Sequence, residues 1–415
     1  MTANGKSLRV SSLPLSGNEK QRRSKRKRFF IRLAALFFLA FFCMPCTVFA
    51  FAEEGGDGKE ELNQNILDQI DKLDTEELQK YIDSLGVFSD KNVGERIFDY
   101  IKGEKFDYGS FGQQILNVLF EDVKNMLPAF ACICAVALLC GILSSVKSSF
   151  ADQTSADVIF LVGYAAALIP VLAVLTECFS RAWASVTSMQ KQMQLVFPIL
   201  MTLMAASGGS VSAAIYQPAV AFLSTSIVSI VSSVVLPLTL TIIAFSMAGN
   251  LSGELKLNNF SSFFKSINKW IIGACVSVFG LFFTVQGLTA ATYDGITRRA
   301  AKYAIGTGVP IVGGFLSGGF DLAVAGSVLI KNSLGSLSIF LMVSVLFEPL
   351  VLLMAANLFL RLTAAVTQPL GESRISNFLG ETADNLNYCT AGLLFVAFLY
   401  FIGIVLVICS SEVIF

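Results

Sequence analysis

Residues 126–146 read MLPAFACICAVALLCGILSSV, a stretch without one charged side chain. A helix needs about 20 mainly apolar residues to cross the hydrocarbon core of a bilayer. Comparable stretches follow at residues 158–180, 270–292, 304–330, 334–357 and 389–409. The sequence therefore predicts an all-α, polytopic membrane protein with about seven or eight spans.

The composition of the whole chain favours the same class. Of 415 residues, 54% are hydrophobic and 14% are charged, and the mean hydropathy is +0.68. Soluble domains carry about 25% charged residues. Histidine is absent and the nine cysteines are scattered, which removes the commonest general base and argues against a disulfide framework. We expect no enzyme activity, no cofactor, no metal site and no catalytic residue.

The first 52 residues have the layout of a secretory signal peptide. They carry ten Lys or Arg and one acidic residue, and the dense basic run Lys20–Arg28 precedes the short apolar stretch Leu33–Met44. Ala50-Phe51-Ala52 then supplies a small-residue cleavage site. We expect cleavage after Ala52, and the alternative is an uncleaved first transmembrane helix. The apolar stretch explains the basic run better than nucleic-acid binding does.

An acidic segment follows over residues 53–125, with eight basic and eighteen acidic residues. Cleavage would leave it outside the cytoplasm. Apolar residues recur at helical spacing between Leu62 and Leu73, and a second helix is expected over Thr75–Leu85. The amphipathic stretch Phe111–Val123 runs into the first span. We therefore predict a small helical exported segment over residues 53–125 and a multi-span membrane domain over residues 126–415.

Two regions leave the number of spans open. Residues 195–249 are almost wholly apolar but contain Pro198, Gly208-Gly209, Pro218 and Pro237. They can hold two long spans, three short ones or a re-entrant loop, and we favour two. Residues 251–269 alternate large apolar residues with lysines, which indicates either an amphipathic helix at the membrane interface or a loop helix packed on the bundle.

Few ionisable side chains lie within the predicted spans, and such residues usually face a bundle interior or a water path. The four that stand out are Glu177, Asp321, Glu348 and Arg361. Glu348 directly precedes Pro349, which frees a backbone carbonyl in the preceding turn. Pairing of Asp321 or Glu348 with a basic residue is therefore a hypothesis to be tested.

The run Gly306–Asp321 reads GTGVPIVGGFLSGGFD and is the richest in glycine. Small residues four apart allow close helix packing, and a broken helix lining a conduit is the alternative. The run is neither a phosphate-binding loop nor a dinucleotide fingerprint. An intramembrane aspartyl protease is also disfavoured, because its second motif is not matched beside Tyr293-Asp294. The candidate conduit or packing residues are Gly313, Gly314, Gly318, Gly319, Asp321 and Glu348.

Several motifs in the second half of the chain resemble the stage III sporulation protein AE family of endospore-forming bacteria. They are the Arg298–Lys302 cluster, Val309–Ser317, Ile330–Gly335, and Gln368–Ile375 with its continuation through Asn377–Leu386. The layout of leader, acidic segment and multi-span body is similar along the whole chain. The basic extension over residues 1–19 is a departure and concerns the position of the start codon.

The resemblance implies a role in sporulation. Members of this family are multi-pass membrane components of a transenvelope complex made in the mother cell, together with an ATPase, ring-forming subunits and a forespore-side partner. It implies no catalytic residue, and nucleic acid is not an expected partner. The chain would lie in the mother-cell membrane around the forespore, with its N-terminal segment outside the cytoplasm. The alternatives are a stand-alone secondary transporter of a small solute, for which no internal repeat is seen, and a non-conducting scaffold.

Overall fold

The computed structural model describes residues 58–85, 91–102, 108–150, 153–251, 257, 259–282, 313–370 and 373–409. The predicted signal peptide over residues 1–52, Tyr293-Asp294 and the Arg298–Lys302 cluster lie outside these ranges. Almost every described residue is helical, and the described ranges contain no strand, so the all-α prediction is confirmed. Residues 59–415 form one compact unit.

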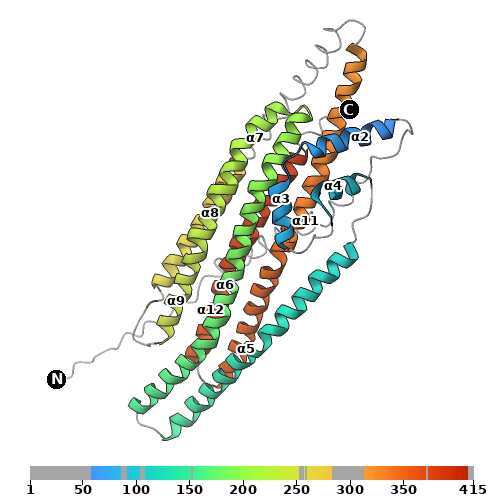
Figure 1. Cartoon of the computed structure of the whole chain (residues 1–415). Helices are drawn as coiled ribbons and strands as arrows, with labels where there is room; N and C mark the ends of the chain where they lie inside the picture. Colours follow the sequence, from blue (N-terminus) through green and yellow to red (C-terminus); the bar gives the residue numbers. More distant parts are fainter. Residues whose placement is uncertain are drawn as a thin grey trace, which may run out of the picture. The chain divides into compact units, whose positions relative to one another are not determined.

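Three short helices make up most of the acidic segment that the structure describes. They are α2 (Gly58–Asp71), α3 (Glu76–Leu85) and α4 (Val93–Ile101). Their apolar residues are buried, including Ile66, Ile70 and Ile82. Glu76 and Glu77 stand in the first turn of α3, where an acidic side chain is favoured by the helix dipole. Helix α3 packs on the long helix α6 and α4 packs on α11 (Figure 1). The Val93 amide at the start of α4 donates to Gln79 Oε1 of α3 at 2.7 Å.

The first two long helices form an antiparallel hairpin. Helix α5 covers Tyr108–Phe150 and α6 covers Gln153–Ala206, with Pro128 inside the first and Pro170 and Pro198 inside the second. The predicted span 158–180 is thus only part of a helix of 54 residues. At 1.5 Å per residue, α6 is about 80 Å long.

Residues 195–249 hold the last turns of α6 and most of one further helical stretch, and not two or three complete helices. The chain turns once, at Gly208, whose φ of 88° suits glycine, and continues as one helical column from Ser210 to Leu251. Pro218 and Pro237 lie inside that column, which has π-helical turns at Leu223–Ile227 and Val231–Val235. The named parts are α7 (Ser210–Phe222), α8 (Val228–Ile230) and α9 (Leu236–Leu251).

Residues 259–282 form one helix, so the expected boundary near residue 270 is wrong. The helix packs back along α9. Phe245 stacks with Phe260 and Phe264, and the Asn268 side chain donates to Thr239 Oγ1 at 2.9 Å. These contacts hold the more polar half of the helix against α9.

The last two long helices are α11 (Gly313–Thr367) and α12 (Ser373–Cys409), joined through a 3-10 turn at Gln368–Leu370. The expected separate spans 304–330 and 334–357 are therefore wrong, because α11 runs through the interval between them. Lys331 is fully buried there, and its ammonium group donates to the carbonyls of Val407 at 3.1 Å and Ile408 at 2.8 Å. A cation at the carboxyl end of α12 is favourable both as a hydrogen-bond donor and through the helix dipole.

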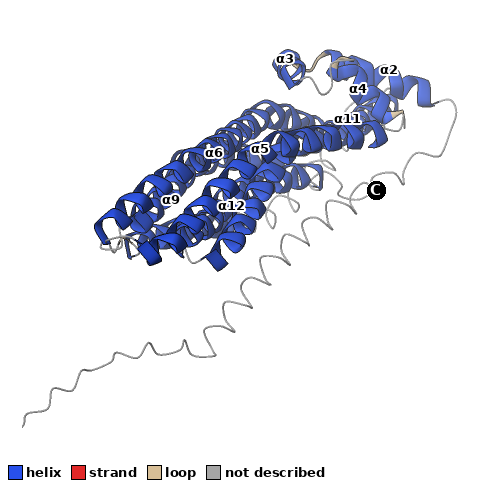
Figure 2. Ribbon diagram, turned by 90° about the horizontal axis from the view of Figure 1, so that it is seen from below, coloured by secondary structure: helices blue, strands red, loops and turns tan. Residues whose placement is uncertain are grey.

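Five helical stretches of the described chain are long and apolar enough to cross a membrane. They are Phe120–Ile142, Leu161–Ala206, Ser210–Leu251, Asp321–Thr367 and Arg374–Cys409. Figure 2 shows α5, α6, α9, α11 and α12 side by side. Helix α12 is the most buried of them and packs on α6, α9 and α11. A predicted count of seven or eight spans is thus not reached among the described residues.

Candidate functional site

A charged cluster joins three long helices near the middle of α6. The Arg181 guanidinium contacts Glu177 at 2.7 Å on the same helix, Asp122 of α5 at 3.9 Å, and Glu348 of α11. Glu177 and Arg181 are four residues apart, so they lie on one helix face. The Arg181 side chain is 40% exposed and that of Glu348 37% exposed, so the pairs lie at the surface of the bundle. One arginine with three carboxylates gives the cluster a formal negative charge.

Pro349 accounts for a second contact beside this cluster. Proline has no amide hydrogen, so the carbonyl four residues earlier, that of Val345, lacks its helical donor. The hydroxyl of Ser185 on α6 donates to this oxygen at 2.9 Å. The proline thus creates an acceptor on α11 that α6 satisfies, and this contact holds the two helices in register beside Glu348.

The helices of the acidic segment dock on α6 and α11 beyond the charged cluster. The hydroxyl of Tyr81 on α3 lies 2.6 Å from Ser188 Oγ, and the buried Gln192 side chain donates to it at 3.0 Å. Gln192 also donates to the Leu341 carbonyl at 3.3 Å, so one amide joins α3, α6 and α11. Burial raises the pKa of Tyr81, although its contacts with Ser188 and Gln192 act in the opposite direction.

Helix α2 makes a similar contact farther along α11. Gln69 donates to the Ala323 carbonyl at 3.1 Å and accepts from Ser327 Oγ at 2.8 Å. Gly326 allows this approach, since a Cβ there would lie 3.2 Å from Gln69 Nε2. The acidic segment is therefore packed on long helices rather than on itself alone.

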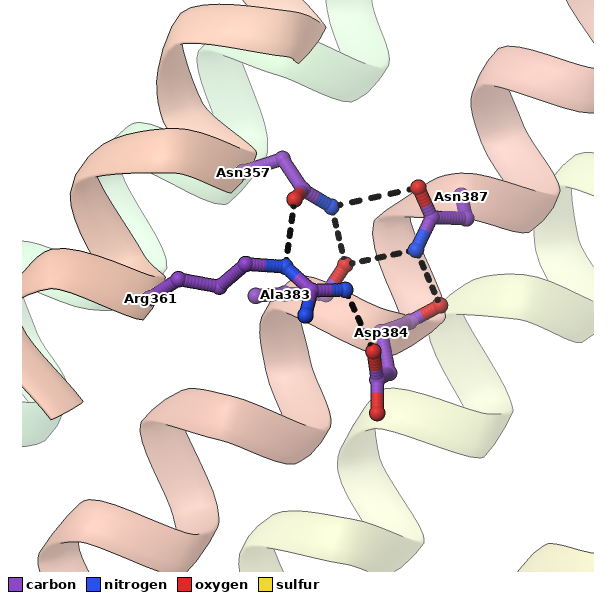
Figure 3. A network of polar contacts seen from close by, with 5 residues as sticks. All are labelled: Asn357, Arg361, Ala383, Asp384 and Asn387. Carbon is purple, nitrogen blue, oxygen red and sulfur yellow. Dashed lines mark hydrogen bonds and ion pairs between the residues drawn. The ribbon is translucent and has the colours of Figure 1, made fainter. Parts of the chain in front are cut away.

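A polar cluster joins α11 to α12 (Figure 3). Along α11 it lies on the side of the charged cluster that is away from the contacts of Tyr81 and Gln69. Arg361 contacts Asp384 at 2.5 Å and donates to Asn357 Oδ1 at 2.8 Å. Asn357 in turn donates to the Ala383 carbonyl and, at 3.3 Å, to Asn387 Oδ1. The Arg361 and Asp384 side chains are 51% and 65% exposed, so the cluster opens on the surface of the bundle.

The exposed surface of α12 is polar throughout its first half. Between Arg374 and Ile408, the exposed residues are Arg374, Asn377, Asp384 and Asn387. Glu381 lies on the same face, half-buried, and accepts hydrogen bonds from Ser246 and, at 3.3 Å, from Asn250. We call the face formed by Arg374, Asn377, Glu381, Asp384 and Asn387 the polar stripe.

The structure does not bring all of the predicted site residues together. Gly313, Gly314, Gly318 and Gly319 lie in the first two turns of α11, with side-chain surroundings outside the described residues. Asp321 is exposed, and it lies on the same helix as Glu348 but about 40 Å away. Glu348 has a basic partner, Arg181. Within the described ranges no three His, Cys, Asp or Glu side chains are grouped so as to hold a metal ion.

Sequence reasoning missed the polar stripe. Its members are spaced by three or four residues, which is a helical period. The period is visible in the sequence between Arg374 and Asn387, but it overlaps the motifs that carry the family resemblance, and no exposed face was predicted from it.

A family model for stage III sporulation protein AE matches residues 92–411. The chain belongs to this family. It is 23% identical over 367 residues to the stage III sporulation protein AE of Bacillus subtilis (strain 168), with 87% of this chain and 92% of that protein covered. No solved structure matches.

The charged cluster of Arg181, the polar cluster of Arg361 and the polar stripe all lie within the matched residues 92–411. Helices α2 and α3 precede residue 92, so the contacts of Gln69 and Tyr81 lie before the matched region. Membership supports a sporulation-related role, and the five apolar helices suggest a membrane protein.

Proposed function

We propose that the chain is a multi-pass membrane subunit of the channel or secretion-like complex that links mother cell and forespore after engulfment. It would lie in the mother-cell membrane around the forespore, with residues 53–125 outside the cytoplasm after removal of a signal peptide. Its partners would be an ATPase, ring-forming subunits and a forespore-side protein. Family membership supports the sporulation role, and the length of two helices supports the place in a transenvelope assembly.

That length is the observation on which the proposal depends. Helices α6 and α11 have 54 and 55 residues, or about 80 Å each. The hydrocarbon core of a bilayer is about 30 Å thick. Roughly 50 Å of each helix therefore has to lie outside one hydrocarbon core. A subunit that connects two membranes needs such a projection, whereas a small-solute transporter does not.

Exposed large apolar side chains indicate which part of α6 and α11 faces lipid. On α6 they end at Trp183, and none follows through Ala206. On α11 none is exposed from Asp321 to Leu353, and four follow beyond Glu348. These four are Met354, Leu358, Leu362 and Val366. We place the bilayer around the part of the bundle between the charged cluster of Arg181 and the turn that joins α11 to α12.

The contacts of α6 with α8 and α9 give a second indication of this level. Gln190 of α6 donates to Ser229 Oγ at 3.4 Å, and Tyr164 of α6 donates to the Met247 carbonyl at 2.8 Å. Thr239 lies close to the middle of Ser229–Met247 in the sequence, so it is about level with Glu177, near the middle of Tyr164–Gln190.

Both tryptophans of the chain lie within about 10 Å of this level along the helix axes. Trp270 follows two residues after Asn268, which contacts Thr239, and its side chain is 76% exposed. Trp183 follows two residues after Arg181 and is 50% exposed. Tryptophan is enriched at membrane–water interfaces. The two side chains and the charged cluster are therefore consistent with one interface plane.

With the bilayer at this level, the helices of the acidic segment and the glycine-rich run would lie outside the hydrocarbon core. The contacts of Tyr81 and Gln69 lie beyond the interface plane, on the side expected to be outside the cytoplasm. Asp321 and the glycines before it would lie about 40 Å beyond Glu348, outside the hydrocarbon core. Their role would then be assembly in the space between the membranes rather than lining of an intramembrane conduit.

A gene deletion combined with a functional fluorescent fusion tests the proposed function. We expect the deletion to stop development after engulfment and the fusion to mark the mother-cell membrane around the forespore. Normal sporulation of the deletion strain would contradict the proposal. A fusion spread over vegetative membranes, together with an uptake or efflux defect, would instead favour the transporter alternative.

A further inference from the structure

We infer that a polar seam inside the bundle, where α12 and the helix over residues 259–282 both pack on α9, binds ordered water molecules. The carboxamide side chains of Asn385 and Asn268 form its core, and Glu381 stands at its half-buried end. The seam lies within one chain, so it depends neither on the level of the bilayer nor on a further copy. The joint between these three helices is then a hydrated site and not dry apolar packing.

The seam contains two buried side chains with polar atoms that lack partners. Asn385 and Asn268 are both fully buried. In the part of the chain that the structure describes, neither amide atom of Asn385 has a hydrogen-bond partner, and Asn268 Oδ1 has none either. A buried polar atom without a partner keeps the full cost of its desolvation, so such atoms are rare in folded proteins. Both amides therefore require a ligand that forms hydrogen bonds.

Asn385 lies on the face of α12 that packs on the helical column ending in α9. Four residues before it, Glu381 accepts a hydrogen bond from Ser246 of that column. Seven residues after it, a Cβ at Gly392 would lie 3.4 Å from Val235 Cγ1 of the same column. Residues four and seven apart share a helix face, so Asn385 faces the column between these two contacts.

Asn268 reaches the same stretch of this interface from the helix over residues 259–282. Its amide nitrogen donates to Thr239 Oγ1 of α9 at 2.9 Å. Thr239 lies between the residues of the column that contact Glu381 and Gly392, and Asn385 lies between the same two residues on α12. Thr239 and Asn385 are therefore within about one helical turn, or about 5 Å, of each other along the two antiparallel helices.

A contact between neighbours of the two amides supports this alignment. The Lys269 ammonium group lies 5.7 Å from the centroid of the Tyr388 ring. Lys269 directly follows Asn268, and Tyr388 follows Asn385 by three residues. The helix over residues 259–282 thus contacts α12 within one turn of Asn385.

Water is the ligand that suits these groups. A water molecule both donates and accepts hydrogen bonds, as the two amide atoms of Asn385 require, and a buried water typically forms about three hydrogen bonds to otherwise unpartnered groups. The half-buried Glu381 side chain lies one turn from Asn385 on the same face of α12. Its carboxylate gives water a short route from the surface of the bundle to the buried amides.

Radiolytic footprinting of the full-length, detergent-solubilised protein tests for the bound water. A short X-ray pulse ionises water in contact with a side chain, and mass spectrometry measures the oxidation that the resulting radical causes. Cys389 is the reporter, because it is fully buried and lies one turn after Asn385. The equally buried Met204 of α6 is the control.

We expect Cys389 to be oxidised in the parent protein and Met204 to be protected. In Asn385→Val, an apolar side chain of similar size replaces the amide, so Cys389 should lose most of its label. Protection of Cys389 in the parent, or equal oxidation of Cys389 in both proteins, would overturn the inference.

A double-mutant cycle then tests whether the two amides share the water. Asn385→Val and Asn268→Val are made singly and together, and thermal unfolding in one detergent gives their melting temperatures. A shared water makes the two losses non-additive, so the double variant should melt at a higher temperature than the summed losses predict. Additive losses would show two separate sites and no common seam. A melting temperature of Asn385→Val above that of the parent would show that the amide is dry, and would also overturn the inference.

Discussion

The hydroxyl of Ser185 occupies the hydrogen-bonding position that Pro349 leaves open at the carbonyl of Val345. The donor comes from α6 and the acceptor from α11, so a missing bond within one helix becomes a bond between two helices. The contact lies beside the ion pair of Arg181 and Glu348. It couples the register of α6 and α11 at the level where we place the membrane interface.

Removal of this hydroxyl should destabilise the protein in a way that depends on the proline. Ser185→Ala leaves the Val345 carbonyl without its side-chain donor, which should cost about 1–2 kcal/mol. Pro349→Ala supplies an amide hydrogen four residues on, so in that background Ser185→Ala should cost much less. Thermal unfolding of the four detergent-solubilised proteins measures the coupling. Additive effects of the two substitutions would show that the hydroxyl does not replace the missing amide.

The sequence predicted the kind of helices better than their ends. The predicted spans 304–330 and 334–357 leave Lys331-Asn332-Ser333 between them as a break. In the structure Lys331 caps α12, and a Cβ at Gly335 would lie 2.5 Å from Ile408 Cδ1. Both residues therefore serve close packing of α11 on the end of α12. Such a role depends on a partner more than 70 positions away, which local patterns do not reveal.

The contacts within the candidate site could not be predicted from the sequence for the same reason. Glu348 was recognisable because a carboxylate before a proline is unusual inside an apolar run. Its partner Arg181 was not, since the pairing depends on how α6 and α11 are aligned. The polar stripe was accessible to helical-period reasoning, but its exposure became apparent only with the packing of α12 against α9 and α11. Asp321 and Glu348 were grouped as candidates, and the continuity of α11 separates them.

Reversal of the charge at Arg181 should impair assembly of the long helices. Arg181→Glu places a fourth carboxylate beside Glu177, Asp122 and Glu348. Because the group is partly exposed, we expect a loss of about 1 kcal/mol or somewhat more, with a melting temperature lower by a few degrees. The double variant Arg181→Glu, Glu348→Arg restores one pair and should recover part of the loss. Equal melting temperatures of the single and double variants would contradict a direct pairing.

Loss of the Tyr81 hydroxyl should loosen the docking of α2, α3 and α4 on the long helices. Tyr81→Phe removes the group that lies between Ser188 and Gln192, at an expected cost of about 1 kcal/mol. Limited proteolysis of residues 58–102 in solubilised protein should become faster, while cleavage within the long helices stays unchanged. Lys80→Ala is the matched control, because the neighbouring Lys80 side chain is 76% exposed. The docking contact is not supported if the two variants are cleaved at the same rate as the parent.

Replacement of Lys331 should release the carboxyl end of α12. Lys331→Met keeps most of the side-chain volume but removes both donors to the carbonyls of Val407 and Ile408. Hydrogen bonds from a charged donor contribute about 1.5–3 kcal/mol each. Part of this is offset because a buried cation is no longer required.

We therefore expect faster amide hydrogen exchange over residues 405–409, with little change over residues 390–400, where α12 is packed along its length. Lys124→Met, at an exposed position of α5, should leave both peptides unaffected. If Lys331→Met leaves exchange at the end of α12 unchanged, the lysine does not stabilise that terminus. Its burial would then have to be explained by its other surroundings, and the argument that it joins α11 to α12 would fail.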